Sequence, residues 1–220
     1  MGSDIADRLH EIKSALPQGV ELIAVSKFHP AEAISEAYAA GQRVFGESRA
    51  QELQEKASRL PGDIEWHFIG HLQTNKVKPV VAVASMIQSI DSMRLLKAVG
   101  DAAVKAGRVI DVLLQVHVAR EETKTGFLPE EMASAAAEAI RMPGLRLRGV
   151  MGMASNTDDQ QRVRADFRAI RRCFDALKES VAAGLPCFDT VSMGMSHDRQ
   201  LAVEEGSTMV RIGTDIFGER

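Results

Sequence analysis

Short apolar runs alternate along the chain with segments whose apolar residues recur every three or four positions. Near the N-terminus, Ile5, Leu9, Ile12 and Leu16 have the spacing of one helical face, which predicts an amphipathic helix over Asp4–Leu16. Eight later runs have the length and the β-branched composition of strands. They are Glu21–Ser26, Arg43–Gly46, Glu65–Ile69, Met86–Ile90, Asp111–Val118, Arg146–Met151, Phe188–Met193 and Thr208–Ile212.

Helical patterns lie between these runs. The predicted helices are Ala31–Ala40, Ser48–Ser58, Ser92–Ala106, Pro129–Arg141 and Asp159–Ala183, with shorter ones over Thr74–Val83 and His197–Glu204. Strict alternation predicts a parallel α/β sheet, and eight repeats favour closure into a (β/α)8 TIM barrel with an extra N-terminal helix. A doubly wound open sheet is the alternative, but no Gly-x-Gly-x-x-Gly turn follows the first strand. No linker or change of composition divides the chain, so we expect a single domain over residues 1–220.

Composition and charge narrow the class of partner. The net charge of −3 gives no reason to expect nucleic acid or a membrane surface, and runs such as Val80–Ala84 are too short to span a bilayer. The arginines of Asp159–Ala183 flank an apolar stripe, which indicates a solvated outer helix face. Without a secretory signal, Cys173 and Cys187 are expected to be buried free thiols of a cytoplasmic protein.

In barrels of this kind the active site lies at the C-terminal ends of the strands. The first strand brings Lys27 to this end, the second Glu47 and Ser48, the third His71 and the sixth Met151. A zinc site at His67 and His71 is not expected, because no third ligand is evident.

The last two loops have the composition of a phosphate cradle. Their residues are Ser192, Gly194, Ser196, Arg211, Gly213 and Thr214. Small residues let backbone N–H groups approach an anion closely, and these two loops are the usual phosphate site of the fold. Ser196 is the expected N-cap of the helix over His197–Glu204, which would turn that helix start toward the anion.

Lys27 ends an apolar strand, where a lysine is often a solvated surface charge. At a barrel mouth, a partly desolvated lysine near other cations loses its proton more readily and can form a Schiff base with an aldehyde. Lys27 and a phosphate cradle across the mouth therefore describe a ligand that is both an aldehyde and a phosphate. Pyridoxal 5'-phosphate (PLP) and a sugar phosphate both meet this description, and the residues alone do not separate them.

Five segments match a known family. They are Ala24–Lys27, Val44–Glu47, Trp66–Lys76, Ser192–Ser196 and Val210–Thr214, and they run from the first strand to the eighth. On these segments the chain resembles the pyridoxal phosphate homeostasis proteins, small relatives of the alanine racemase barrel.

The resemblance implies a role for each matching residue. Lys27 matches the lysine that holds PLP as a Schiff base, and Arg211 matches the arginine that approaches the pyridine nitrogen. Ser192, Ser196, Gly213 and Thr214 match positions around the phosphate. We include Gly194, His71 and Met151 among the expected cofactor-binding residues. An arginine keeps its proton and makes the ring a weak electron sink.

Three residues at the expected mouth depart from the family pattern. Ser48 and His117 stand where asparagine is usual, and Gly152 stands where threonine is usual. These departures leave the lysine and phosphate contacts intact, but they leave open how the ring is hydrogen-bonded.

The resemblance implies a carrier or buffer of PLP, with no catalytic residues and no metal. The alternative is a PLP-dependent amino-acid racemase, which needs a base on each face of the substrate carbon. In the related racemases the second base is a tyrosine of a dimer partner, and a β domain completes the architecture. Here Tyr38 is the single tyrosine, expected in an outer helix, and we expect no further residues after Arg220 to build a second domain.

These considerations favour the carrier, and we expect it to be a monomer. Apo-enzymes that require PLP are candidate recipients. Lys76 and Lys124 are candidate secondary amines for excess aldehyde.

Overall fold

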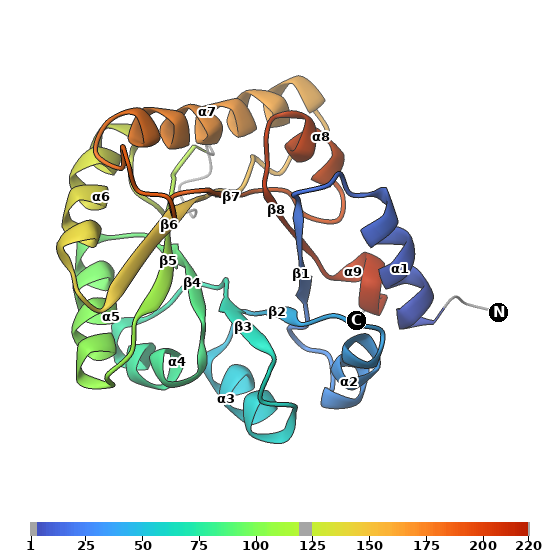
Figure 1. Ribbon diagram of the computed structural model, residues 1–220. Helices are drawn as coiled ribbons and strands as arrows, with labels where there is room; N and C mark the ends of the chain where they lie inside the picture. Colours follow the sequence, from blue (N-terminus) through green and yellow to red (C-terminus); the bar gives the residue numbers. More distant parts are fainter. Residues whose placement is uncertain (1–3, 119–124, 220) are drawn as a thin grey trace.

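The computed structural model describes residues 4–118 and 125–219, in which parallel strands close into a barrel in the order of the sequence (Figure 1). The strands are β1 (Glu21–Val25), β2 (Val44–Glu47), β3 (Glu65–Phe68), β4 (Met86–Ile90), β5 (Ile110–Gln115), β6 (Leu145–Met151), β7 (Thr190–Ser192) and β8 (Met209–Ile212). β8 pairs with β1 and closes the ring. The predicted barrel is confirmed.

Helices cover the outside of the barrel (Figure 1). They are α1 (Ile5–Ala15), α2 (Ala31–Ala39), α3 (Ala50–Arg59), α4 (Val77–Val83), α5 (Met93–Lys105), α6 (Met132–Arg141), α7 (Gln160–Glu179), α8 (Arg199–Glu204) and α9 (Thr214–Phe217), with 3-10 turns over Thr74–Lys76 and Pro129–Glu131. The added helix α1 packs beside α2 and α9: the Ile5 amide donates to Glu36 Oε1 (3.0 Å), and Arg8 Nε donates to the Ile216 carbonyl (2.7 Å).

Two boundaries differ from prediction for identifiable reasons. β5 ends at Gln115 instead of Val118, because the chain turns to pair with its own returning loop: the His117 amide bonds the Phe127 carbonyl and the Phe127 amide bonds the Gln115 carbonyl. α7 ends at Glu179 instead of Ala183, because the following residues turn toward Gly184, which has a φ of +79°.

Side chains of each strand alternate between the barrel interior and the layer under the helices. On β1, Leu22 and Ala24 join the large core between strands and helices. Ile23 belongs to a separate interior cluster with Met86, Leu113, Met151 and Met209. This cluster is the apolar part of the barrel interior and forms the floor beneath the mouth.

The long helix α7 confirms the predicted split between an apolar stripe and a charged outer face. Its stripe is fully buried and consists of Val163, Phe167, Ile170, Phe174 and Leu177. On the outer face, Arg164 and Arg168 form ion pairs with Glu205 after α8 (3.1 and 2.8 Å).

The cysteines are free, but the prediction that they are buried is wrong, because Cys173 and Cys187 are both partly exposed. Among the described residues, none of the helices has the length and apolar character needed to cross a membrane.

Candidate functional site

The register of the closing strands brings the end of β1 beside the loop after β8. Ala24 pairs with Ile212, so Gly213 lies next to Val25. A Cβ at Gly213 would lie 3.0 Å from the Val25 carbonyl oxygen, which shows how closely the two strand ends approach. Because β8 also neighbours β7, the lysine turn and both predicted anion loops share one side of the mouth (Figure 1).

Lys27 is half-buried and lies in a tight turn immediately after β1. The turn is closed by the His29 amide, which donates to the Ser26 carbonyl at 3.0 Å. Phe28, the third residue of this turn, has a φ of +67°. Lys27 is therefore held on a bend of the backbone, beside the loop that carries Gly213.

A chain of buried polar groups crosses the barrel interior from Arg211 to His67. Arg211 Nη1 donates to Ser192 Oγ (2.6 Å), and Ser192 Oγ donates to Gln88 Oε1 (2.7 Å). The Gln88 amide nitrogen in turn lies 2.9 Å from His67 Nδ1. Arg211 Nη2 also donates to the Gly152 carbonyl (3.0 Å). The chain joins strands β3, β4, β7 and β8 and fixes the orientation of the guanidinium.

The polar chain also fixes which ring nitrogen of His67 carries the proton. Because Gln88 Oε1 accepts from Ser192, the Gln88 amide nitrogen must donate to His67 Nδ1. His67 is therefore a neutral imidazole that carries its proton on Nε2. Burial is the main reason that its pKa falls to about 4, with Asp111 raising it and Arg148 lowering it by smaller amounts.

Arg211 is a buried cation, only 5% exposed. Burial lowers its pKa to about 10, with Asp198 acting weakly in the opposite direction, so the guanidinium stays protonated at neutral pH. Within residues 4–118 and 125–219, no ion pair joins it to a carboxylate. A buried charge of this kind is costly without a partner. The site therefore suits a ligand that brings a hydrogen-bond acceptor or a negative charge to Arg211.

The loop after β7 needs its glycine for packing. Gly194 has a φ of +95°, and a Cβ there would lie 2.6 Å from Ala202 Cβ on α8. The Ser196 carbonyl accepts from Arg199 Nη1 (2.6 Å), and the same guanidinium group pairs with Asp215 on α9. Arg199 thus ties the two predicted anion loops together, a link that the sequence pattern did not indicate.

The prediction that Ser196 is the N-cap of the next helix is wrong. α8 begins at Arg199, and its N-cap is Asp198. The Asp198 carboxylate accepts from the Met195 amide at 2.6 Å, which folds residues 195–198 into a turn before the helix can start. This carboxylate makes the helix start unsuitable for a second anion, so an anion is left to the loops themselves. Ser196 is half-buried and Thr214 is exposed in these loops.

The predicted residues therefore lie at different depths. Ser192 is fully buried below the mouth and supports Arg211, and Met151 belongs to the interior floor. Glu47, expected at the mouth, instead points away from the interior: the neighbouring Gly46 faces Ile23 inside the barrel, and the Glu47 carboxylate bonds Lys56 Nζ of α3 at 2.7 Å.

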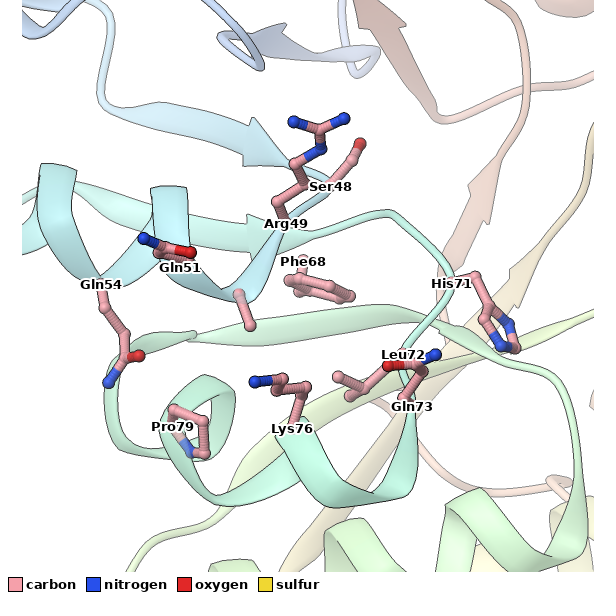
Figure 2. Close-up of a pocket in the computed structure, with 11 residues that line it drawn as sticks. Ser48, Arg49, Gln51, Gln54, Phe68, His71, Leu72, Gln73, Lys76 and Pro79 are labelled. Carbon is pink, nitrogen blue, oxygen red and sulfur yellow. The ribbon is translucent and has the colours of Figure 1, made fainter.

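His71 lies in a separate hollow of about 510 Å³ at the edge of the mouth, between the start of α3 and the segment after β3 (Figure 2). Its ring is 60% exposed, and Nδ1 lies 3.0 Å from Asp91 Oδ2. Figure 2 shows His71 at one end of the hollow and Gln54 and Pro79 at the other. Lys76 also lines this hollow, whereas Lys27, Ser192 and Arg211 do not. The candidate amine Lys124 lies outside the described residues.

The three departures from the family pattern have different surroundings. Ser48 lines the same hollow as His71, and His117 is half-buried where β5 leaves the barrel. Gly152 faces the outer layer: a Cβ there would lie 2.3 Å from Ile170 Cδ1 on α7. Only its carbonyl oxygen reaches the site, through Arg211. A glycine at this position therefore removes no side chain from the mouth.

Gly152→Thr is expected to destabilise the protein by about 1–3 kcal/mol, because the added side chain overpacks against Ile170. Thermal or urea unfolding measures the change. Gly62→Thr is the matched control, since a Cβ at Gly62 meets nothing within 4 Å. Adding Ile170→Val removes the nearest clashing atom and should recover part of the loss. A Gly152→Thr protein as stable as the control would contradict this packing.

Comparisons with known proteins agree on one family. The model of the alanine racemase N-terminal domain matches residues 3–220. The chain is 41% identical to the pyridoxal phosphate homeostasis protein of Aquifex aeolicus, over 91% of this chain and 87% of that one. It is 36% identical to the protein of the same name from Escherichia coli, over 99% of this chain and 97% of that one.

Solved structures give the same grouping. PipY of Synechococcus elongatus PCC7942 without PLP has a TM-score of 0.93 at 39% identity, over 98% of this chain and 100% of that one. The same protein with PLP bound has a TM-score of 0.88 at 38% identity, with the same coverage. Alanine racemase from E. faecalis shares only the fold, with a TM-score of 0.76 at 17% identity over 98% of this chain and 58% of that one. The chain belongs to the pyridoxal phosphate homeostasis proteins, within the alanine racemase N-terminal domain family.

Proposed function

We propose that the protein binds PLP through Lys27 and acts as a carrier or buffer in PLP homeostasis. The single observation that carries this proposal is the arrangement around the mouth, where a half-buried lysine turn, two glycine-containing loops and a buried guanidinium converge. Further support comes from its relatives, which are pyridoxal phosphate homeostasis proteins, and from the structure of PipY with PLP bound.

The chain's own residues have separable roles in this proposal. PLP supplies, when bound, an aldehyde carbon and a ring that can accept electrons. Lys27 offers the amine that holds the aldehyde carbon. Gly194, Ser196, Gly213 and Thr214 supply the loops that hold the phosphate through backbone N–H groups.

Arg211 offers the ring nitrogen a donor that is protonated at neutral pH, and Ser192 and the Gly152 carbonyl keep that donor in place. A charged donor that keeps its proton at neutral pH limits how far the ring can accept electrons. This property favours storage of PLP over chemistry on a bound amino acid.

The second base that a racemase needs is not supplied by Tyr38. Its hydroxyl bonds Asp63 Oδ1 at 2.7 Å, and the Arg43 guanidinium lies 3.9 Å from the centre of its ring. Asp63 precedes β3 and Arg43 precedes β2, so this cluster lies at the end of the barrel opposite the mouth. We therefore propose that the protein has no catalytic turnover.

We further propose that a single chain suffices, since the lysine turn, both loops and Arg211 come from one barrel. A cytoplasmic location, one domain over residues 1–220 and handover of PLP to apo-enzymes stay predictions.

The test is reconstitution of the purified protein with PLP. We expect a visible absorption band that borohydride removes, and no sustained racemisation of L- or D-amino acids by chiral analysis. A protein that takes up no PLP would overturn the binding proposal. Sustained turnover that disappears in Lys27→Ala would overturn the carrier role and favour the racemase.

Arg211→Met is expected to weaken PLP retention by about 10-fold or more, because it removes a charge-assisted hydrogen bond to the ring. The dissociation rate, measured by transfer of PLP to an excess of an apo-enzyme, reports the loss. Arg172→Met on the outer face of α7 is the control. Unchanged release from Arg211→Met would show that the assigned contact is wrong.

A further inference from the structure

The backbone on both sides of Lys27 is held by one helix. Lys56 Nζ donates to the Ser26 carbonyl at 2.9 Å, directly before Lys27. The Phe28 amide, directly after Lys27, donates to Glu52 Oε2 at 2.8 Å. Glu52 and Lys56 are one turn apart on α3 and pair with each other at 3.1 Å. The helix therefore holds the lysine turn through hydrogen bonds to the backbone on both sides of Lys27.

A third residue, Glu47, anchors both Ser26 and Lys56 inside the protein. Glu47 Oε1 accepts from both Ser26 Oγ and Lys56 Nζ, each at 2.7 Å. Glu47 is fully buried, and its Oε2 atom has no hydrogen-bond partner among the described residues. The cluster lies between the barrel and α3, behind the strand end that carries Lys27.

The turn needs these hydrogen bonds because Phe28 has an unfavourable backbone conformation. It is the only non-glycine residue with a positive φ in the described part of the chain. A turn with positive φ at its third residue normally has glycine there, since a Cβ disfavours this conformation. The bond to Glu52 supports Phe28, and the Arg49 guanidinium lies 4.4 Å from the centre of its ring.

Electrostatics keep Glu52 charged in this role. Burial raises the pKa of its carboxyl, but the bonds from the Phe28 amide and Lys56, with the nearby charges of Lys56 and Arg49, outweigh burial and lower the pKa overall. An ionised carboxylate is the stronger acceptor for a backbone amide.

We propose that Glu52 and Lys56, anchored by Glu47, are positioning residues that hold the Lys27 turn in the geometry needed to bind the aldehyde. This inference rests on the proposed function of Lys27. It assigns to α3, which lies outside the phosphate loops and Arg211, a part in setting how long PLP is retained.

The test is a double-mutant cycle of Glu52→Ala and Phe28→Gly. Glu52→Ala is expected to speed PLP release by about 10-fold, because a hydrogen bond to a charged group is lost. Glycine adopts a positive φ without outside support, so adding Phe28→Gly should return most of this loss. Glu55→Ala on the exposed face of α3 is the matched control and should release PLP at the wild-type rate.

A second readout uses the protein without PLP. Amide hydrogen exchange near Phe28 and acetylation of Lys27, followed by peptide mass spectrometry, should both be faster in Glu52→Ala and slower again in the double variant. Should Glu52→Ala not fold, Glu52→Gln keeps an acceptor for the Phe28 amide and should show a smaller effect in the same direction.

The outcomes separate two explanations. If Glu52 merely stabilises α3, Phe28→Gly cannot rescue Glu52→Ala, and that result would overturn the proposal. Wild-type values for Glu52→Ala in both readouts would overturn it as well. A wild-type protein that takes up no PLP overturns the proposed function instead, while the exchange and acetylation readouts still decide whether α3 holds the turn.

Discussion

Lys27→Ala is expected to eliminate the borohydride-reducible adduct with PLP while leaving the barrel folded. The reason is that, in the proposed site, the Lys27 amine is the atom that bonds the aldehyde carbon. The neighbouring Lys56 amine on α3 is already bonded to the Ser26 carbonyl, Glu47 and Glu52. After reduction of the wild-type protein, peptide mass spectrometry should place the added mass on the peptide that contains Lys27. Circular dichroism and thermal unfolding check that the variant retains the fold.

Two further variants test whether the adduct requires the amine of Lys27. One keeps the positive charge without the amine, and the other removes a different lysine. Lys27→Arg keeps a positive charge but supplies no amine nucleophile, so it should also lose the adduct. Lys76→Ala removes the lysine that lines the hollow of Figure 2 and should leave the adduct unchanged. An adduct that survives in Lys27→Ala and disappears in Lys76→Ala would move the covalent site from β1 to that hollow.

Acidification is expected to destabilise the protein through His67. In the folded protein its pKa is about 4, against an ordinary value near 6.5 in the unfolded chain. As the pH falls below 6.5, His67 becomes protonated in the unfolded state, whereas in the folded state it stays neutral until about pH 4. The free energy of unfolding should therefore fall over this window, by about 3 kcal/mol from this group alone.

His67→Gln tests this assignment, because glutamine can accept the hydrogen bond from Gln88 but does not titrate. Urea unfolding at a series of pH values should show a shallower loss of stability between pH 6.5 and 4 in His67→Gln than in the wild type. His10→Gln, at an exposed position on α1, should follow the wild-type curve. Parallel curves for His67→Gln and the wild type would mean that His67 is not held neutral in the barrel.

The amino-acid sequence by itself determined the architecture of this protein. The alternation of strand and helix patterns is local, because each pattern depends on the spacing of apolar residues within one segment. Eight such repeats leave few ways to bury every apolar face, and a closed barrel is the simplest. Lys27 at the end of the first strand and glycine in the last two loops were equally visible, since strand ends of a parallel barrel meet at one mouth.

Only the tertiary structure decided what the polar residues do. Alternation shows that Gly46 and Glu47 face opposite sides, but not which side is the interior, so Glu47 was expected at the mouth and lies under α3. The chain from Arg211 through Ser192 and Gln88 to His67 joins strands that are far apart in sequence. Such contacts depend on the register of the closed barrel, which no local pattern encodes. For the same reason, the hydrogen bonds from α3 to the lysine turn became visible only once the helix was packed against β1.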